Sequence, residues 1–362
     1  MKNLTNIQLN YKTKVFKLKD EFKISRISKK IVTVIEIHLV AESISGLGEC
    51  IPYPRYNERL DDILIYLKKN KSKIEKKLSK KNLTKIPFLS LQNALTAALL
   101  DIQLKKDKIN FIKTYQVKKK FTTAITIPIF DLKKTKQILQ KFKNTKIIKI
   151  KLDQSEVIQK LSLIRTICPK SQIIIDANES WDQQFFKNNV KILEQFNILL
   201  IEQPFPRGKD HYLKNIKTKL KFCADETFHL KNKTINNDIK CYQCVNLKLD
   251  KFGTHEQIIK YIKTAKKLKK KLLLGCMVSS SLSLYPALRY FKYCDYFDLD
   301  GACFLKKDRA GGIIYKNGTA SLRPDFIWGK KKASKKRPFL ILKINLKYYY
   351  LLPAGVSDLA AA

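Results

Sequence analysis

Short apolar, mostly β-branched runs recur along the chain from about residue 124 onward. Each run is followed by a polar turn and an amphipathic stretch, and successive runs begin 23 to 28 residues apart. This spacing is typical of a strand–crossover–helix unit in a parallel sheet. Eight such units predict an α/β fold, a (β/α) barrel rather than an open sheet. The runs are AITIPI (124–129), IIKIKL (147–152), QIIID (172–176), ILLIE (198–202), KFCAD (221–225), CVNLKL (244–249), LLLGC (272–276) and YFDLD (296–300).

The first 115 residues follow a different pattern. Strands are expected around 5–18 and 31–40, and helices around 58–79 and 89–106, which predicts a separate α+β domain. The loop GLGECIPYPRYNE (46–58) lies between them, and we expect its Arg55 and Tyr56 to be exposed. The predicted division of the chain is an α+β domain (1–115), the barrel (116–310), a terminal strap (311–329) and a tail (330–362).

The tail from residue 330 is basic at first and then apolar. We expect it to lie outside the fold. The alternative is a basic amphipathic anchor for a membrane surface or a partner.

The chain carries 73 Lys and Arg against 31 Asp and Glu in 362 residues, a net charge of +42. The lysines are spread over the whole sequence, which favours a solvated basic surface over a specific nucleic-acid site. The apolar runs are too short to span a bilayer, and the N-terminus has no apolar secretory segment. Eight scattered cysteines predict reduced thiols. We therefore expect a cytoplasmic protein without a transmembrane segment or specific nucleic-acid partner, and a homo-oligomer is compatible with the sequence.

Charged side chains end six of the eight predicted strands. In a parallel barrel the carboxyl ends of the strands meet at one face, so these groups are expected to gather there. Two lysines at i and i+2 on the second strand also point the same way. The residues are Lys149 and Lys151, Asp176, Glu202, Asp225, Lys248, and Asp298 with Asp300.

Three of these carboxylates lie on adjacent strands and would repel one another without a cation between them. A site of carboxylates without His or Cys favours Mg²⁺, with Mn²⁺ second. Lysines stand on both sides, on strands two and six, where a nearby cation would lower a lysine pKa toward useful basicity. Two lysines on opposite faces of one carbon can remove a proton and return it on the other side. That chemistry is racemisation or epimerisation.

The motifs KIK, DANESW, IEQP, ADE and NLKLDK, in this order, resemble the muconate-lactonising subgroup of the enolase superfamily. The likeness extends over residues 5–329 and includes the loop GECIPYPRYNE and the helix NALTAALLDIQLKK. It implies a (β/α)₇β TIM-like barrel with an N-terminal α+β capping domain. It also implies roles for individual residues: Asp176, Glu202 and Asp225 as Mg²⁺ ligands, Lys151 and Lys248 as the catalytic acid/base pair, and Lys149 as a binder of the substrate carboxylate.

The sequence DLDG on the eighth strand resembles the dipeptide epimerases within that subgroup. Those enzymes interconvert L-Ala-L-Glu and L-Ala-D-Glu, and an Asp-x-Asp at this place binds the substrate ammonium. Asp298 and Asp300 match it. The resemblance implies five further substrate-binding residues: Cys276, Met277 and Val278 in GCMVSSSL, Thr126, and Arg26, which suits a side-chain carboxylate or else is solvated.

The sequence departs from the subgroup at two positions. Ser279 stands where Glu is frequent, and Thr254 where a second Gly follows Gly253. The pair in CYQC (241–244) has no second pair with which to form a zinc site.

The predicted function is therefore that of an isomerase, a Mg²⁺-dependent epimerase of an Ala-Glu-like dipeptide acting by two-base proton transfer through a metal-stabilised ene-diolate. The alternatives are an N-acylamino-acid racemase or an o-succinylbenzoate synthase of the same superfamily. A basic scaffold that binds polyanions is the non-enzymatic alternative.

Overall fold

The computed structural model describes residues 4, 6–25, 27–79, 82–232, 235–326 and 328–329. Contacts divide the chain into two compact units, Met1–Lys330 and Lys331–Ala362. The predicted tail and its two alternative roles lie outside the described residues, and so does Arg26. The predicted boundaries at residues 115 and 310 stay predictions.

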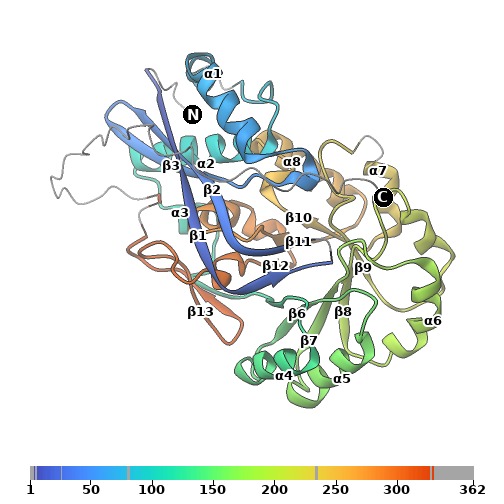
Figure 1. Ribbon diagram of the computed structural model, residues 1–362. Coiled ribbons are helices and arrows are strands. Elements are labelled where there is room, and N and C mark those ends of the chain that lie inside the picture. Colours follow the sequence, from blue (N-terminus) through green and yellow to red (C-terminus); the bar gives the residue numbers. More distant parts are fainter. Residues whose placement is uncertain are drawn as a thin grey trace, which may run out of the picture. The chain divides into compact units, whose positions relative to one another are not determined.

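A parallel sheet of eight strands, counted over the described residues, forms a nearly closed barrel (Figure 1). Each strand pairs with the next one along the chain. Every run that the sequence predicts as a strand overlaps one of them, so the predicted barrel is confirmed. The strands are β5 (Ile125–Ile127), β6 (Ile147–Lys151), β7 (Gln172–Asp176), β8 (Ile198–Glu202), β9 (Phe222–Ala224), β10 (Cys244–Leu247), β11 (Lys271–Gly275) and β12 (Tyr296–Asp298).

Hydrogen bonds join the first and last strands of the barrel. The Ala124 backbone N donates to the carbonyl of Phe297 at 2.8 Å, and the Leu299 backbone N donates to Thr123 Oγ1 at 2.8 Å. The Thr126 backbone N donates to the carboxylate of Asp300 at 2.6 Å. Side chains thus supply part of the hydrogen bonding between β5 and β12. One of them is Asp300, which belongs to the predicted site.

Helices cover the outside of the barrel, as α4, α5 and α6 show beside β6 to β8 in Figure 1. In α8, Ile258 and Ile262 are buried against the strands. Thr254 caps α8 with a capping box to Gln257, so this departure from the subgroup starts a helix. The helices after the cap are α3 (Phe111–Thr114), α4 (Leu132–Lys141), α5 (Val157–Ile167), α6 (Gln183–Leu193), α7 (Ile235–Asp238), α8 (His255–Lys267) and α9 (Ser281–Ala287), with 3₁₀ helices η2 (Asp210–Asn215), η3 (Ile239–Cys241), η4 (Leu249–Lys251), η5 (Leu288–Tyr293) and η6 (Gly301–Phe304).

The side chains of each barrel strand alternate between two cores. Ile173 and Ile175 of β7 face the helices in the large outer core. Ile174, Leu200 and Cys223 belong to a small core inside the barrel. Because strand side chains have a period of two, the residues two positions further along also point inward. This register places the predicted carboxylates above the inner core.

The N-terminal layer, called the cap below, has its own apolar core. Its antiparallel sheet packs on α2, where a Cβ at Gly46 or Gly48 would meet the Ala98 or Ala94 carbonyl oxygen at 2.1 or 2.0 Å. Those glycines therefore allow the close approach of sheet and helix. The cap comprises β1 (Gln8–Lys23), β2 (Ser28–Ala41), β3 (Ile44–Cys50), η1 (Pro54–Tyr56), α1 (Leu60–Ser79) and α2 (Leu89–Lys106).

The cap contacts the barrel along the β1–β2 hairpin, drawn in blue beside the barrel strands in Figure 1. The backbone N of Ile129 donates to the carbonyl of Lys23 at 3.0 Å. A third sheet orders the end of the described chain and consists of β4 (Lys120–Thr122), β13 (Ile314–Lys316) and β14 (Thr319–Ser321). Beyond it, Trp328 Nε1 donates to the carbonyl of Leu47 at 3.0 Å, so this segment contacts the cap.

A buried carboxyl group lies where α2 meets the barrel. Asn93 Nδ2 donates to Asp250 Oδ1 at 3.1 Å, and both side chains are buried. The pKa of Asp250 is raised to about 7, first by burial and also by the nearby carboxylates of Glu58 and Glu49, against the hydrogen bond from Asn93. The folded state therefore favours the neutral form of this group.

We expect Asp250→Asn to stabilise the protein at high pH. The folded pKa of Asp250 lies above its ordinary value of 3.8, so the folded state binds more protons between these values and the parent loses stability as the pH rises toward 7. The Asn variant has no such loss, and its advantage should grow by about 3 kcal/mol between pH 5 and pH 8. Urea unfolding at both pH values measures this difference. A pH-independent difference would contradict the burial of a neutral acid.

Candidate active site

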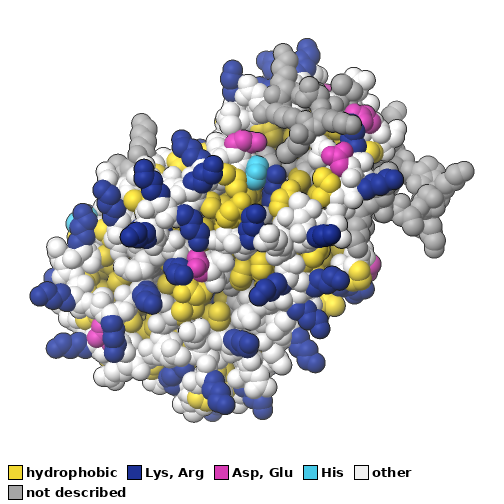
Figure 2. Space-filling view, turned by 180° about the vertical axis from the view of Figure 1, so that it is seen from behind, with side chains coloured by type: hydrophobic (Ala, Val, Ile, Leu, Met, Phe, Trp, Pro, Cys, Tyr) yellow, Lys and Arg dark blue, Asp and Glu magenta, His cyan; other side chains and the backbone are white. Residues whose placement is uncertain are grey.

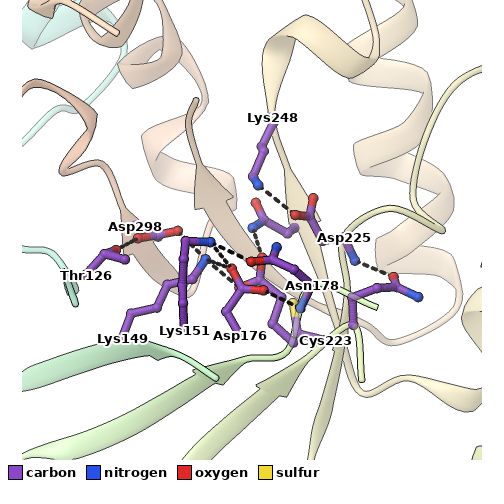
Figure 3. A network of polar contacts seen from close by, with 12 residues as sticks. Thr126, Lys149, Lys151, Asp176, Asn178, Cys223, Asp225, Lys248 and Asp298 are labelled. Atoms are coloured by element: carbon purple, nitrogen blue, oxygen red, sulfur yellow. Dashed lines mark hydrogen bonds and ion pairs between the residues drawn. The ribbon is translucent and has the colours of Figure 1, made fainter. Parts of the chain in front are cut away.

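The last residues of β6 bring two lysines into the barrel. Lys149 Nζ lies 3.0 Å from Asp176 Oδ2, 2.8 Å from Glu202 Oε2 and 2.8 Å from Asp298 Oδ2 (Figure 3). Burial lowers the pKa of Lys149, but these three carboxylates outweigh burial and hold its pKa well above the ordinary value. Lys149 is thus a fixed cation at the centre of the acidic cluster.

The two predicted catalytic lysines reach the cluster from different strands. Lys151 Nζ donates to Asp176 Oδ2 at 2.7 Å and to Asn178 Oδ1 at 3.0 Å. Lys248, directly after β10, donates to Asp225 Oδ2 at 2.6 Å. In Figure 3 they approach the cluster from different sides, and both line one cavity.

The carboxylates around Lys248 determine the direction of its pKa shift. Burial lowers the pKa of its ammonium, but the carboxylates of Asp225 and Glu202 outweigh burial and raise it above the ordinary value. The lowering expected from the sequence concerned a cation bound beside the lysine, and it stays a prediction.

Three carboxylates from β7, β8 and the end of β9 lie within the barrel mouth. Asp176, Glu202 and Asp225 are 0%, 0% and 2% exposed. The pKa of Glu202 is raised to about 8, first by burial and also by the charges of Asp176 and Asp225, against the charge of Lys149. Glu202 Oε1 accepts from Asn246 Nδ2 at 2.8 Å. Glu202 Oε2 is buried without a hydrogen-bond partner, since the Lys149 ammonium lies within ion-pair distance but outside hydrogen-bonding geometry.

The carboxylate set suits a hard divalent cation by its chemistry. Within the described ranges, no three His, Cys, Asp or Glu side chains are arranged as a ready metal site. The acidic side chains pair with lysines instead. However, a buried carboxylate oxygen without a hydrogen-bond partner, next to two further carboxylates, is a ligand set that Mg²⁺ accepts. The residues therefore fit the ion that the sequence predicts.

Buried groups that the sequence analysis did not identify hold this cluster in place. Lys251 is fully buried, and its Nζ donates to Asp225 Oδ1 at 2.6 Å, to the Asp225 carbonyl at 2.7 Å and to the Asn246 carbonyl at 2.9 Å. Asn246 has room because a Cβ at Gly275 would meet its Oδ1 at 2.2 Å. A sequence signal existed for Asn246, which stands two residues before Lys248 and so points to the same face.

The predicted acidic pair lies at the end of β12 and is bridged by Thr126. The Thr126 backbone N donates to Asp300 Oδ2 at 2.6 Å, and its Oγ1 donates to Asp298 Oδ1 at 3.4 Å. Cys276 Sγ donates to the Asp298 carbonyl at 3.3 Å. Burial, and after it the nearby Asp298 carboxylate, raises the pKa of Asp300 to about 7. The pair thus shares less than two full negative charges near neutral pH.

A cavity of about 380 Å³ lies where the barrel mouth meets the cap. The cap contributes mainly apolar side chains to it, together with the ammonium-bearing Lys29. Most of the predicted site residues line it: Thr126, Lys149, Lys151, Asp225, Lys248, Cys276, Met277, Val278, Asp298 and Asp300. The structure therefore brings most of the strand-end charges and of the predicted substrate-binding residues to one cavity.

Ser279 and Tyr56 have local roles. Ser279 Oγ donates to the carbonyl of Met277 at 3.1 Å, so it shapes the loop after β11. The expected exposure of Tyr56 was wrong, because its ring is buried with its centroid 4.4 Å from that of His229. Arg55 is half-buried and contacts Glu179.

The surface charge is dispersed. Figure 2 shows Lys and Arg side chains scattered over one face, with apolar side chains between them. In the part of the chain that the structure describes, no helix combines the length and the apolar character needed to cross a membrane. The cysteines, including Cys241 and Cys244 of CYQC, are free thiols among the described residues.

Comparisons with known proteins agree with this architecture. Residues 134–325 match the family described as Enolase C-terminal domain-like. The chain is 31% identical to N-acetyl-D-glutamate racemase of Pseudoalteromonas sp over 87% of this chain and 100% of the relative. It is 30% identical to L-Ala-D/L-Glu epimerase of Escherichia coli (strain K12) over 83% of this chain and 95% of the relative.

A solved structure from Agrobacterium tumefaciens is also similar. It is an enolase family member with homology to dipeptide epimerases, with bound sodium and L-Ala-L-Glu. The TM-score is 0.82 at 28% identity, over 89% of this chain and 100% of that chain. Since the named relatives are racemases and epimerases, the chain is an enzyme of the isomerase class, and the alternative of a scaffold without activity is set aside. The chain belongs to the enolase superfamily, in the group that contains the dipeptide epimerases and the muconate-lactonising enzymes.

Proposed function

We propose that this enzyme inverts the α-carbon of the C-terminal residue in an Ala-Glu-like dipeptide, with Lys151 and Lys248 as its two bases. The observation that carries the proposal is the arrival of both ammonium groups in one cavity, from strands separated by β7, β8 and β9. One lysine takes the α-proton as an amine, and the other returns a proton as an ammonium. When the two lysines swap these roles, the reaction runs in the opposite direction.

The acidic cluster is proposed to hold Mg²⁺ through Asp176, Glu202 and Asp225. When bound, this ion supplies positive charge to the substrate carboxylate and to the negative charge that develops as the α-proton leaves. Lys149 adds a permanent positive charge to the same place, because its pKa is raised well above neutrality despite burial. Lys251 and Asn246 keep Asp225 and Glu202 in position.

The acidic pair at the end of β12 favours a dipeptide as the substrate over an N-acylated amino acid. Asp298 and Asp300 line the cavity on the side of β5 and β12 and suit a free ammonium. Two relatives support this choice: the Escherichia coli protein is named L-Ala-D/L-Glu epimerase, and the Agrobacterium structure holds L-Ala-L-Glu.

An N-acylamino-acid racemase is the second candidate function. The relative from Pseudoalteromonas is named N-acetyl-D-glutamate racemase and is matched over its whole length. Its named substrate carries no ammonium but shares the glutamate side chain with L-Ala-L-Glu. The two candidates therefore differ in what Asp298 and Asp300 would bind and agree on an acidic side chain.

Lys29 is proposed as the cap residue that attracts this acidic side chain. It lines the cavity, its Nζ lies 5.2 Å from the centre of the Tyr53 ring, and burial lowers the pKa of its ammonium. We expect Lys29→Met to lower kcat/KM for L-Ala-L-Glu about tenfold and to leave L-Ala-L-Ala nearly unchanged. Steady-state kinetics with both dipeptides measure this. The control is Lys30→Met, since Lys30 is exposed on the opposite face of the strand. Equal losses for both dipeptides would argue against the role.

The proposed function is tested by α-proton exchange in D₂O. The whole chain with Mg²⁺ is incubated with L-Ala-L-Glu, L-Ala-D-Glu and N-acetyl-glutamate, and the α-proton is followed by NMR. We expect exchange and inversion of both dipeptides with a higher kcat/KM than for N-acetyl-glutamate. Turnover of N-acetyl-glutamate alone would replace the dipeptide by the second candidate. Absence of exchange with every substrate would contradict the proposed function.

A further inference from the structure

We propose that an ion pair between the cap and the barrel, Arg55 with Glu179, positions Lys151 and leaves Lys248 unaffected. The inference rests on the proposed two-base function and concerns its stereochemical symmetry. It makes Arg55 and Glu179 positioning residues for one of the two bases.

The ion pair is bidentate and largely shielded from water. Arg55 Nε donates to Glu179 Oε2 at 3.0 Å, and its Nη2 lies 2.8 and 2.9 Å from the two carboxylate oxygens. The backbone N of Arg207 donates to Glu179 Oε1 at 2.9 Å. The Glu179 side chain is 5% exposed and that of Arg55 32%. Such a pair fixes geometry as well as charge.

Glu179 is covalently next to the residue that holds Lys151. Asn178 Oδ1 accepts from Lys151 Nζ at 3.0 Å, and its backbone N donates to Asp176 Oδ1 at 3.1 Å. Asn178 and Glu179 have φ of 46° and 69°, a left-handed backbone conformation that is uncommon for residues other than glycine and that contacts with the surroundings stabilise. The Arg55 contact supplies such a constraint.

A second cap contact acts on the same loop. Ser25 Oγ donates to the carbonyl of Asn178 at 3.2 Å. The cap thus contacts the loop 177–179 at two places, the backbone carbonyl of Asn178 and the side-chain carboxylate of Glu179. The cap residues Tyr53, Pro54 and Tyr56 around Arg55 line the cavity themselves. The cap segment that lines the cavity therefore contacts the loop that orients one base.

The other base is held by the barrel itself. Lys248 pairs with Asp225, whose backbone N donates to Gln203 Oε1 at 3.0 Å and whose carboxylate accepts from Lys251. Gln203, Lys248 and Lys251 belong to the barrel. The backbone N of Glu179 donates to the Gln203 carbonyl at 2.9 Å, and this bond does not use the Glu179 carboxylate. Loss of the Arg55 contact frees that carboxylate and leaves the backbone bond, so it should disturb Lys151 and leave Lys248 in place.

The experiment compares the two isomers. The isomer that depends on Lys151 is identified as the one whose α-proton exchange is lost in Lys151→Ala. For that isomer we expect Glu179→Gln and Arg55→Met to lower the exchange kcat about tenfold with little change in KM, because a misplaced base costs rate and leaves binding intact. Exchange of the other isomer should change less than about twofold. Arg55→Lys, which keeps the charge, should recover part of the loss.

A matched control is another ion pair between the cap and the barrel, Lys134 with Asp20. Their side chains are exposed and 2.8 Å apart, and both residues are distant in the sequence from Arg55 and Glu179. Lys134→Met should leave both exchanges unchanged. A second readout is amide hydrogen exchange of residues 176–181, which should become faster by about tenfold in Arg55→Met. Equal loss for both isomers, or unchanged amide exchange, would overturn the inference. If the unsubstituted chain exchanges neither isomer, the proposed function fails and the inference falls with it, which is a distinguishable result.

Discussion

Lys248→Ala and Lys151→Ala are each expected to abolish net epimerisation in both directions, with a loss of about a thousandfold or more. Either the removal or the return of the proton is lost, so neither isomer can be converted. Each variant should still exchange the α-proton of the one isomer whose base remains. The two variants should therefore show opposite isomer dependence in D₂O.

The melting temperature of each variant is the control for folding. Removal of Lys248 leaves Asp225 paired with Lys251 at 2.6 Å, so the buried carboxylate keeps a cationic partner. Removal of Lys151 leaves Asp176 with Lys149 at 3.0 Å. Both variants should thus fold, and near-parental epimerisation by either would contradict the two-base assignment.

Asp298→Asn is expected to change which substrate the enzyme accepts. A carboxylate next to a substrate ammonium contributes roughly 1.5–3 kcal/mol, so kcat/KM for L-Ala-L-Glu should fall by roughly 10- to 150-fold. N-acetyl-glutamate has no ammonium, and its kcat/KM should remain within about threefold. Steady-state kinetics with both substrates measure the switch.

The matched control for that prediction is Asp295→Asn. Asp295 precedes β12 and pairs with Lys271 at 2.8 Å at the other end of the barrel strands. It should leave both kcat/KM values unchanged. If Asp298→Asn impairs both substrates equally, the carboxylate acts through Lys149, its partner at 2.8 Å, and the ammonium site is wrong.

The barrel and its site could be predicted from the sequence because the two-residue period of strand side chains places both the inner-core residues and the site residues. Ile174 fills the inner core and Asp176 follows it by two residues, and Leu200 and Glu202 repeat the relation one strand later. Strand, facing direction and site residue could therefore be predicted together. The sequence did not reveal that Thr254 caps α8, since this residue was identified only as a departure from the subgroup.

Contacts between distant segments could not be predicted in the same way. Arg55 and Glu179 are 124 residues apart, and no local pattern links them. Tyr56 was expected to be exposed because its loop is rich in Pro and Asn, but the ring packs on His229 across the cap–barrel boundary. The direction in which the pKa of Lys248 shifts likewise depends on which charged group is nearest to its ammonium. In the structure this group is the Asp225 carboxylate, at 2.6 Å. Such properties are set by tertiary packing.

The most direct test of the two-base site is the isotope content of the first product. L-Ala-L-Glu with an α-proton is converted in D₂O with Mg²⁺, and L-Ala-D-Glu is analysed by mass spectrometry at low conversion. Lys151 and Lys248 lie on different strands, and the lysine that returns the proton has equilibrated with solvent, so nearly every product molecule should carry deuterium at the α-carbon. Product that retains the original protium would contradict the account, because it requires a single base that carries the same proton from one face to the other.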